Sequence, residues 1–210
     1  MIVETKVEPP HPIPYPDNPI IRKLYRTPIL LYRLGLGKLF GKYIMIISTF
    51  GRKSGKVRRT PIEYFRKDNF IYAISGFERD PDWYQNLKAH PYVTLQTAQG
   101  THAMFARTPK TAEEWQGALD YLKESPVPAL VIPEVVDHLD DPEIQAQIRE
   151  WPVVIFEPTE EPCPEPLPVD LYWAWPLILL ALAFQITFWW LISRKNSPSR
   201  KSLLITRQPN

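Results

Sequence analysis

The sequence is poor in cysteine and histidine, which limits the structural chemistry open to it. Cys163 is the one cysteine in 210 residues, so no disulfide can form within the chain. The histidines lie far apart and lack the spacing of a zinc site: they are His11, His90, His102 and His138. We therefore expect no structural metal.

The chain also lacks a strong net charge and a recognisable export signal. Its 25 Lys and Arg against 23 Asp and Glu give a formal charge of +2, so the overall balance gives no reason to expect a nucleic-acid partner. Residues 1–18 contain no apolar run long enough for the hydrophobic part of a secretory signal. We expect them to form an extended, proline-rich lead-in to a folded domain at residues 19–157.

Proline is the residue present in excess. The sequence has 24 prolines, about twice the average share of roughly 5%. Residues 158–170 combine prolines with acidic residues, a composition typical of a stiff polyproline-like spacer. The pattern predicts a linker between the folded domain and whatever follows it.

A long uncharged segment follows this linker. Residues 171–193 read LYWAWPLILLALAFQITFWWLIS and contain no charged side chain, and a helix of this length, at about 1.5 Å per residue, crosses a hydrocarbon core of about 30 Å. Tryptophans at both ends match the aromatic belts of membrane spans: Trp173, Trp175, Trp189 and Trp190. The segment predicts a single-pass transmembrane helix in the cell membrane, followed by a basic tail at residues 194–210.

Two arguments about the orientation of this span conflict. The basic tail and the acidic linker place the tail in the cytoplasm by the positive-inside rule. The missing export signal argues against moving the large domain across the membrane. We give the second argument more weight and expect a cytoplasmic domain.

Short β-type segments dominate residues 19–157. The predicted strands are separated by turn residues and cover residues 43–50, 57–66, 70–75, 92–97, 101–107 and 152–156. Helices are predicted from Asn18-Pro19, over residues 81–90 and from the capping box of Thr111 and Glu114. The apolar stretch at residues 28–40 suits a helix on the core or on a bilayer surface, the core being the more common case. This pattern predicts a mainly β domain with flanking helices, built as a small antiparallel barrel.

The turn at residues 51–56 gathers charge of one sign. It reads GRKSGK and is followed by Arg58 and Arg59. Its glycines allow a tight turn with exposed N–H groups, so amides, the Ser54 hydroxyl and the cations could together hold phosphate oxygens. An ordinary solvated hairpin turn is the alternative, and spacing alone favours it.

A second group of candidate residues lies in the predicted helix at residues 81–90. Trp83, Asn86 and Leu87 share one face of that helix. Trp83 could wall a ring-shaped ligand or pack in the core, the more common role for tryptophan. Asn86 on the same face needs hydrogen-bond partners if it is buried.

These segments resemble the deazaflavin-dependent nitroreductase family, also described as deazaflavin-dependent quinone reductases. The similar stretches are STFGRKSGKVRRTP (48–61), FIYAIS (70–75), DPDWYQNLKAHP (80–91) and REWPVVIFEP (149–158). The resemblance covers about residues 19–158. It implies an FMN-binding-like split β-barrel that binds coenzyme F420, a deazaflavin with a phosphorylated, acidic tail.

The resemblance also implies roles for particular residues. The tail would be held by Arg52, Lys53, Ser54 and Arg58, and the ring end would be lined by Ser75, Trp83 and Asn86. The implied reaction is hydride transfer from the reduced deazaflavin to a small electron-poor acceptor, such as a membrane quinone. In the loop that follows Ser75, Arg79 would replace a cation found in the family.

Several points stay open in the sequence. Tyr64, Ser75 and His138 are candidate proton donors, each more often structural than catalytic. FMN is an alternative cofactor, and a non-enzymatic flavin-binding module is an alternative function. The sequence gives no oligomeric state and does not choose the acceptor.

Overall fold

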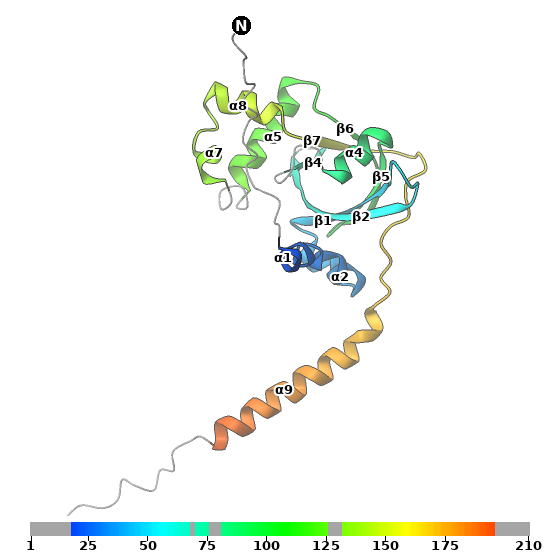
Figure 1. Cartoon of the computed structure of the whole chain (residues 1–210), viewed down its shortest axis with the longest axis vertical. Coiled ribbons are helices and arrows are strands. Elements are labelled where there is room, and N and C mark those ends of the chain that lie inside the picture. Colours follow the sequence, from blue (N-terminus) through cyan, green and yellow to red (C-terminus); the bar gives the residue numbers. More distant parts are fainter. Residues whose placement is uncertain (1–17, 68–69, 76–80, 126–131, 196–210) are drawn as a thin grey trace, which may run out of the picture. The chain divides into compact units, whose positions relative to one another are not determined.

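The computed structural model describes residues 18–67, 70–75, 81–125 and 132–195 (Figure 1). The chain divides into two units, residues 1–169 and residues 170–210. The first contains a sheet with flanking helices, and the second contains η1 (Tyr172–Ala174) and the long helix α9 (Trp175–Lys195). Each unit is described by itself.

The sheet of the first unit has seven strands, all paired antiparallel, in the order β2-β1-β5-β6-β7-β4-β3. The predicted strand segments all form strands, with ends that differ by one or two residues and one prediction divided in two. The strands are β1 (Ile44–Phe50), β2 (Val57–Glu63), β3 (Phe65–Lys67), β4 (Phe70–Ile74), β5 (Tyr92–Thr97), β6 (Gly100–Arg107) and β7 (Val153–Pro158).

The two edge strands of this sheet are consecutive in the chain. Tyr64 alone separates β2 from β3, although these strands lie at opposite ends of the strand order. The sheet must therefore curl until its edges approach, as Figure 1 shows. The mainly β architecture with flanking helices is confirmed, whereas the hydrogen-bonded ladder is that of an open sheet and does not establish a barrel.

The main apolar core lies on the inner, concave face of this curl. Helix α4 (Asp82–Ala89) contributes Trp83 and Leu87 to it. The strands contribute alternate residues, because side chains at i and i+2 share one face of a sheet. These are Met45, Ile47, Ile71, Ala73, Val93, Leu95, Met104, Ala106, Val154 and Phe156.

The remaining helices begin where the sequence provides caps. Asn18 accepts a hydrogen bond from Ile20 N at 2.8 Å at the start of α1 (Pro19–Leu24), and Thr111 and Glu114 form the predicted capping box of α5 (Ala112–Glu124). The sequence analysis did not predict α7 (Pro133–Asp137) and α8 (Pro142–Arg149). Both are short and begin with proline, and they pack with α5 around a second apolar cluster: Tyr121, Leu122, Ile132, Leu139 and Ile148.

The N-terminal helices divide between core and surface. In α2 (Thr27–Arg33), Tyr32 is buried and its hydroxyl donates to the backbone oxygens of Ile44 at 2.9 Å and Gln96 at 3.0 Å. In α1 and α3 (Gly37–Phe40), by contrast, Leu24 is 68% exposed and Leu39 is 70% exposed. The expectation of core packing for residues 28–40 holds for α2 but not for α3.

Residues 159–169, here called the strap, run along the outside of the sheet. Thr159 N donates to Ala103 O, and the Thr94 hydroxyl donates to Pro164 O. The side chain of Gln96 exchanges two hydrogen bonds with the backbone of Leu167, at 2.6 and 3.0 Å, and the Leu167 side chain is buried. The composition predicted a spacer, but this segment is docked because its carbonyls and Leu167 find partners on β5 and β6.

In the second unit, residues Tyr172–Ser193 are long and apolar enough to cross a membrane by length and composition, with a mean hydropathy of 1.8. Their side chains are exposed on all sides of α9. The helix agrees in position with the predicted span at residues 171–193.

Removal of the Gln96 side chain tests the docking of the strap. Gln96→Ala deletes both hydrogen bonds to Leu167, and a net value of about 1 kcal/mol for each predicts a loss of about 2 kcal/mol. The melting temperature of the full chain, measured in detergent, should then fall by about 4–8 °C. Gln116→Ala removes an exposed amide on α5 that bonds Asp120 and is the matched control. Equal effects of the two substitutions would show that the strap contributes no stability.

Candidate functional site

The bend at residues 51–56 is a closely hydrogen-bonded turn. Gly51 N donates to Lys56 O at 2.9 Å, and the N–H groups of Ser54 and Gly55 both donate to Gly51 O, at 3.1 and 2.8 Å. Gly55 has a φ of +65°, a conformation that favours glycine. A Cβ on Gly51 would lie 2.9 Å from Ser54 Oγ. The glycines are therefore what allows the chain to turn so tightly here.

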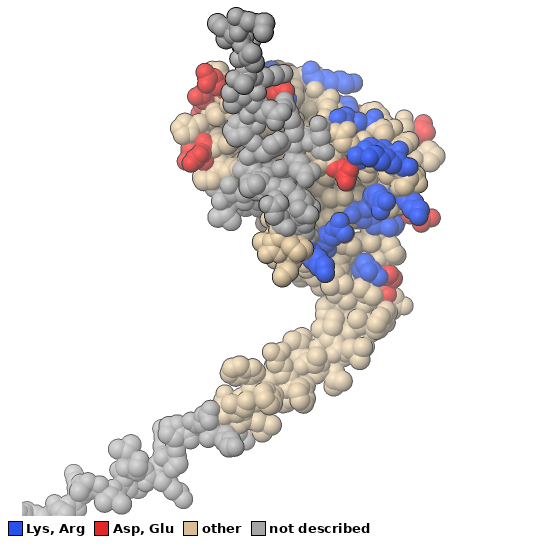
Figure 2. Space-filling model, in the orientation of Figure 1, with Lys and Arg blue, Asp and Glu red and all other residues tan. Residues whose placement is uncertain are grey.

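This bend presents cations to solvent. Lys53, Ser54, Lys56 and Arg58 are exposed. Figure 2 shows Lys and Arg side chains gathered over the flank of the domain that carries β2 and α4. We call Lys53, Ser54, Lys56 and Arg58 the basic bend. It offers positive charge and a hydroxyl donor within a few residues.

Asn86 joins this bend to helix α4 and to strand β1. Its Oδ1 accepts hydrogen bonds from Arg52 N at 3.1 Å and from the Arg52 guanidinium at 3.2 Å. Its Nδ2 donates to Thr49 Oγ1 at 3.3 Å, and the residue is only 5% exposed. A buried amide with these three bonds fixes the bend against the helix. The structure thus brings together two segments that the sequence separates by about thirty residues.

Arg52 is engaged differently from the cations of the basic bend. Its guanidinium also pairs with Asp82 Oδ1 at 2.9 Å, and the Asp82 side chain is 90% exposed. An exposed pair of this kind adds little stability. Both contacts turn the Arg52 side chain toward α4, which leaves the basic bend as the part that faces solvent.

Trp83 packs inside the domain. The side chain belongs to the main core cluster, and its ring meets the edge of the Tyr84 ring at a centroid distance of 5.9 Å. Trp83 was expected either to wall a ring-shaped ligand or to pack in the core, and in the structure it packs in the core. Its burial holds α4 in the position that Asn86 requires.

Ser75 is buried at the end of β4. Its N–H donates to Pro152 O at 3.1 Å. The next segment, residues 76–80, lies outside the described residues, and Arg79 lies within it. Helix α4 follows at Pro81, so Ser75 and α4 are neighbours in the chain.

Two candidate proton donors lie elsewhere. The Tyr64 hydroxyl donates to Gly41 O at 2.7 Å, and burial raises the pKa of Tyr64. His138 is exposed after α7, with Nδ1 2.8 Å from Glu134 O. Neither residue contacts the bend or α4 through a hydrogen bond in the described part of the chain.

The sequence analysis missed two residues of this site. Thr49, the partner of Asn86, reads as an ordinary position in a strand. Asp82, the partner of Arg52, looks in the sequence like an ordinary acidic residue in the first turn of a helix. A negative charge there interacts favourably with the helix dipole in any protein. Only the curl of the sheet, which brings the end of β1 against α4, gives either residue a role.

The arrangement of the described residues suits the binding of an anion. Within residues 18–67, 70–75, 81–125 and 132–195 there is no cluster of three or more His, Cys, Asp or Glu residues that could hold a metal ion. The cations, the hydroxyl and the fixed backbone suit a ligand with phosphate or carboxylate groups. Redox chemistry here would come from that ligand.

Comparison with known proteins agrees with this ligand chemistry. Residues 29–123 match the model of the F420H(2)-dependent quinone reductase family. The matched segment contains the basic bend, Asn86 and Trp83, and it confirms the resemblance noted in the sequence.

Several solved structures are also similar to this chain. An F420-H2 dependent reductase, FDR-A, is 26% identical, with 54% of this chain and 93% of that chain covered and a TM-score of 0.38. A domain-swapped dimer is 23% identical, with coverages of 67% and 100% and a TM-score of 0.40. A putative pyridoxamine 5'-phosphate oxidase from Listeria innocua is 9% identical, with coverages of 62% and 91% and a TM-score of 0.37.

Substitution of Asn86 tests its bridging role. Asn86→Ala leaves Arg52 N and the Thr49 hydroxyl without this partner, so we expect a loss of about 1–3 kcal/mol in the free energy of unfolding. Amide hydrogen exchange at Arg52 should accelerate, because its N–H loses its acceptor. Asp82→Ala, which breaks only the exposed ion pair, should change both measurements little. Similar results for the two variants would contradict the assigned bridge.

Proposed function

We propose that the chain is a membrane-anchored oxidoreductase using a quinone or another electron-poor acceptor, because residues 29–123 match the model of the F420H(2)-dependent quinone reductase family. The family match supports the coarser activity, an oxidoreductase that depends on F420, and gives no support to FMN. The observation that carries the proposal is the basic bend, held against α4 by the buried amide of Asn86.

The residues present fit the acidic tail of coenzyme F420. Lys53 and Arg58 are exposed cations on the bend, and Ser54, also exposed, lies between them in the sequence. Charge-assisted hydrogen bonds from such groups to phosphate are among the stronger polar contacts in proteins. Arg52 acts mainly on the bend itself, through its contacts with Asn86 and Asp82.

The protein's part in the reaction is to bind and orient. Reduced F420, when bound, would supply the hydride, and the fixed bend would set the position of its tail. Asn86 and Trp83 act as positioning residues, one tying α4 to the bend and the other burying α4 in the core. Ser75, at the end of β4 and next in the chain to the segment before α4, is the residue we place nearest the ring end.

The proposed acceptor follows from the proposed anchor. A lipophilic quinone dissolves in the bilayer, and a tether raises the local concentration of the enzyme near it. Helix α9 has the length and composition of a span. The exposed apolar side chains of α1 and α3, such as Leu24 and Leu39, add a second surface suited to lipid. We propose a single-pass protein of the cell membrane with its catalytic domain in the cytoplasm.

The proposed domain division keeps the folded domain at residues 19–157 and the span at residues 171–193. We propose further that the curled sheet functions as a split barrel of the FMN-binding type. The single-residue connection between its edge strands, at Tyr64, supports this. The ligand would then lie outside the curl, where the bend meets α4, because core side chains fill the inside at that end.

Removal of two cations tests the cofactor site. Lys53→Ala/Arg58→Ala should weaken F420 binding by about 3 kcal/mol or more, roughly 100-fold in Kd, if both side chains contact the tail. Binding is measured by fluorescence titration. Lys110→Ala/Arg149→Ala removes the same charge from exposed positions elsewhere and should leave Kd within about threefold at moderate salt. Unchanged affinity in the first variant would contradict the assigned tail site.

The same preparation separates an enzyme from a binding module. Reduced F420 should lose its reduced-state absorbance as it is oxidised by a menaquinone analogue in detergent. Tight cofactor binding without turnover of any acceptor would favour the non-enzymatic module.

Charged substitutions in α9 test the anchor. The full chain should remain with the membrane fraction in high salt and leave it in detergent. Leu180→Arg/Phe184→Arg places two cations within the span, each costing about 2.5–3.5 kcal/mol near its centre, and should release the protein. Membrane retention of this double variant would argue against the span.

A reporter fused after Asn210 tests the orientation of the span. It should read periplasmic if the catalytic domain is cytoplasmic. A cytoplasmic reporter would reverse the proposed orientation.

A further inference from the structure

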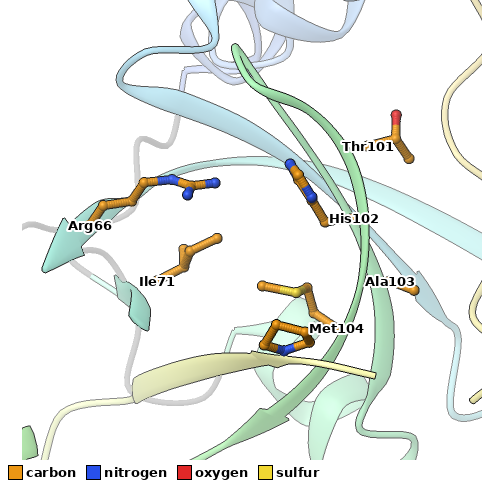
Figure 3. A pocket seen from close by; sticks show the side chains of 7 residues that line it. Arg66, Ile71, Thr101, His102, Ala103 and Met104 are labelled. Carbon is orange, nitrogen blue, oxygen red and sulfur yellow. The ribbon is translucent and has the colours of Figure 1, made fainter. Parts of the chain in front are cut away.

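A cavity of about 360 Å³ lies on the inner face of the sheet, away from the basic bend. Strands β3, β4, β6 and β7 form its walls. Figure 3 shows the arrangement of its side chains. Its volume is near the lower limit of known ligand sites, about 300–1,000 Å³. The cavity therefore has room for a small molecule but not for a dinucleotide-sized one.

The floor of this cavity is apolar. Ile71 and Met104 line it and belong to the main core cluster, and Pro158 completes the apolar part. In Figure 3 the side chains of Ile71 and Met104 lie below the space between Arg66 and His102. A ligand with an apolar body would bury that body against these residues.

His102 provides a polar group that needs a partner. Its Nε2 atom is buried and has no hydrogen bond to any described residue. A buried polar atom without a partner costs free energy, so such atoms in proteins generally bond to protein, water or ligand. His102 is one of the residues that line the cavity, so a rotation of its ring would bring Nε2 to a ligand there.

Arg66 provides the charge. Figure 3 shows its guanidinium extending from β3 toward His102 on β6, and none of the described residues that line the cavity is acidic. Burial and the nearby Arg66 lower the pKa of His102, which favours the neutral imidazole. The lining thus combines one cation with one neutral hydrogen-bonding ring.

We propose that this cavity binds a small monocarboxylate with an apolar body, which Arg66 holds through the carboxylate and to which His102 Nε2 donates a hydrogen bond. A planar guanidinium matches a carboxylate with two parallel bonds. One cation balances one negative charge, whereas a phosphate dianion would leave charge uncompensated beside an apolar floor.

This site is separate from the proposed cofactor site. His102 pairs with Leu95, which in turn pairs with Ile47 in the middle of β1. Asn86 contacts Thr49 on the same strand. The described residues that line the cavity include none of the basic bend and not Asn86, so occupancy of one site can be measured without the other.

Benzoate is the probe for this proposal, with benzyl alcohol as its neutral analogue. In the full chain in detergent, labelled histidine rings are followed by NMR, and His102→Gln assigns the His102 signal. Benzoate should shift the His102 signal in a saturable way and raise its pKa, because a bound anion favours the charged ring. Benzyl alcohol should give at least tenfold weaker binding. Equal binding of the two probes, a preference for inorganic phosphate, or no shift at His102 would overturn the proposal.

Matched variants complete the experiment. Arg66→Gln should weaken benzoate binding at least tenfold. Lys67→Gln is the control on the next residue, because Lys67 pairs with Asp120, and it should leave benzoate binding unchanged. The comparison of the two probes on the unaltered protein needs no variant, so a folding defect in Arg66→Gln would not prevent the test. F420 affinity is measured alongside, and loss of F420 binding with benzoate binding intact would count against the proposed function alone.

Discussion

The buried amide of Asn86 is the contact on which the candidate site depends. Three hydrogen bonds join it to two residues: to the backbone and the side chain of Arg52 and to the side chain of Thr49. Because the amide is shielded from water, each lost bond would leave a polar group unsatisfied, and the penalty is greater than for a surface contact. The exposed pair of Arg52 and Asp82 can break at little cost, whereas the Asn86 bridge cannot. The position of the basic bend is therefore set from inside the domain.

The curl of the sheet is what makes this bridge possible. Tyr64 joins the two edge strands, so the sheet encloses one apolar face, and Trp83 and Leu87 insert α4 into that face. Core burial of α4 supplies stability, and Asn86 on the same helix then meets the end of β1. The cavity lined by Arg66 and His102 lies in the same curl, among β3, β4, β6 and β7. One deformation of the sheet thus creates both sites.

Local patterns in the sequence predicted most of the strands and helix starts. The capping box at Thr111, the N-cap at Asn18 and the alternating strand residues act over a few positions, so they can be read without the fold. The docked strap could not be predicted this way, since prolines and acids look the same in a free spacer, and its hydrogen bonds to Thr94 and Gln96 are long-range. Likewise, Asn86 stood out as a residue needing partners, but its partners Arg52 and Thr49 emerge only from the tertiary structure.

The small net charge concealed a strong asymmetry. Between Asn18 and Ile62 the sequence contains no Asp or Glu, while Lys and Arg recur throughout. Most of the balancing acids lie later, with 15 of the 23 Asp and Glu between residues 113 and 170. A surface divided in this way attracts anions over the range of a Debye length, about 8–10 Å at ordinary ionic strength, even when the total charge is near zero. The charge of each folded segment is therefore a better guide to its ligands than the net charge of the chain. At the bend, that charge favours an acidic cofactor.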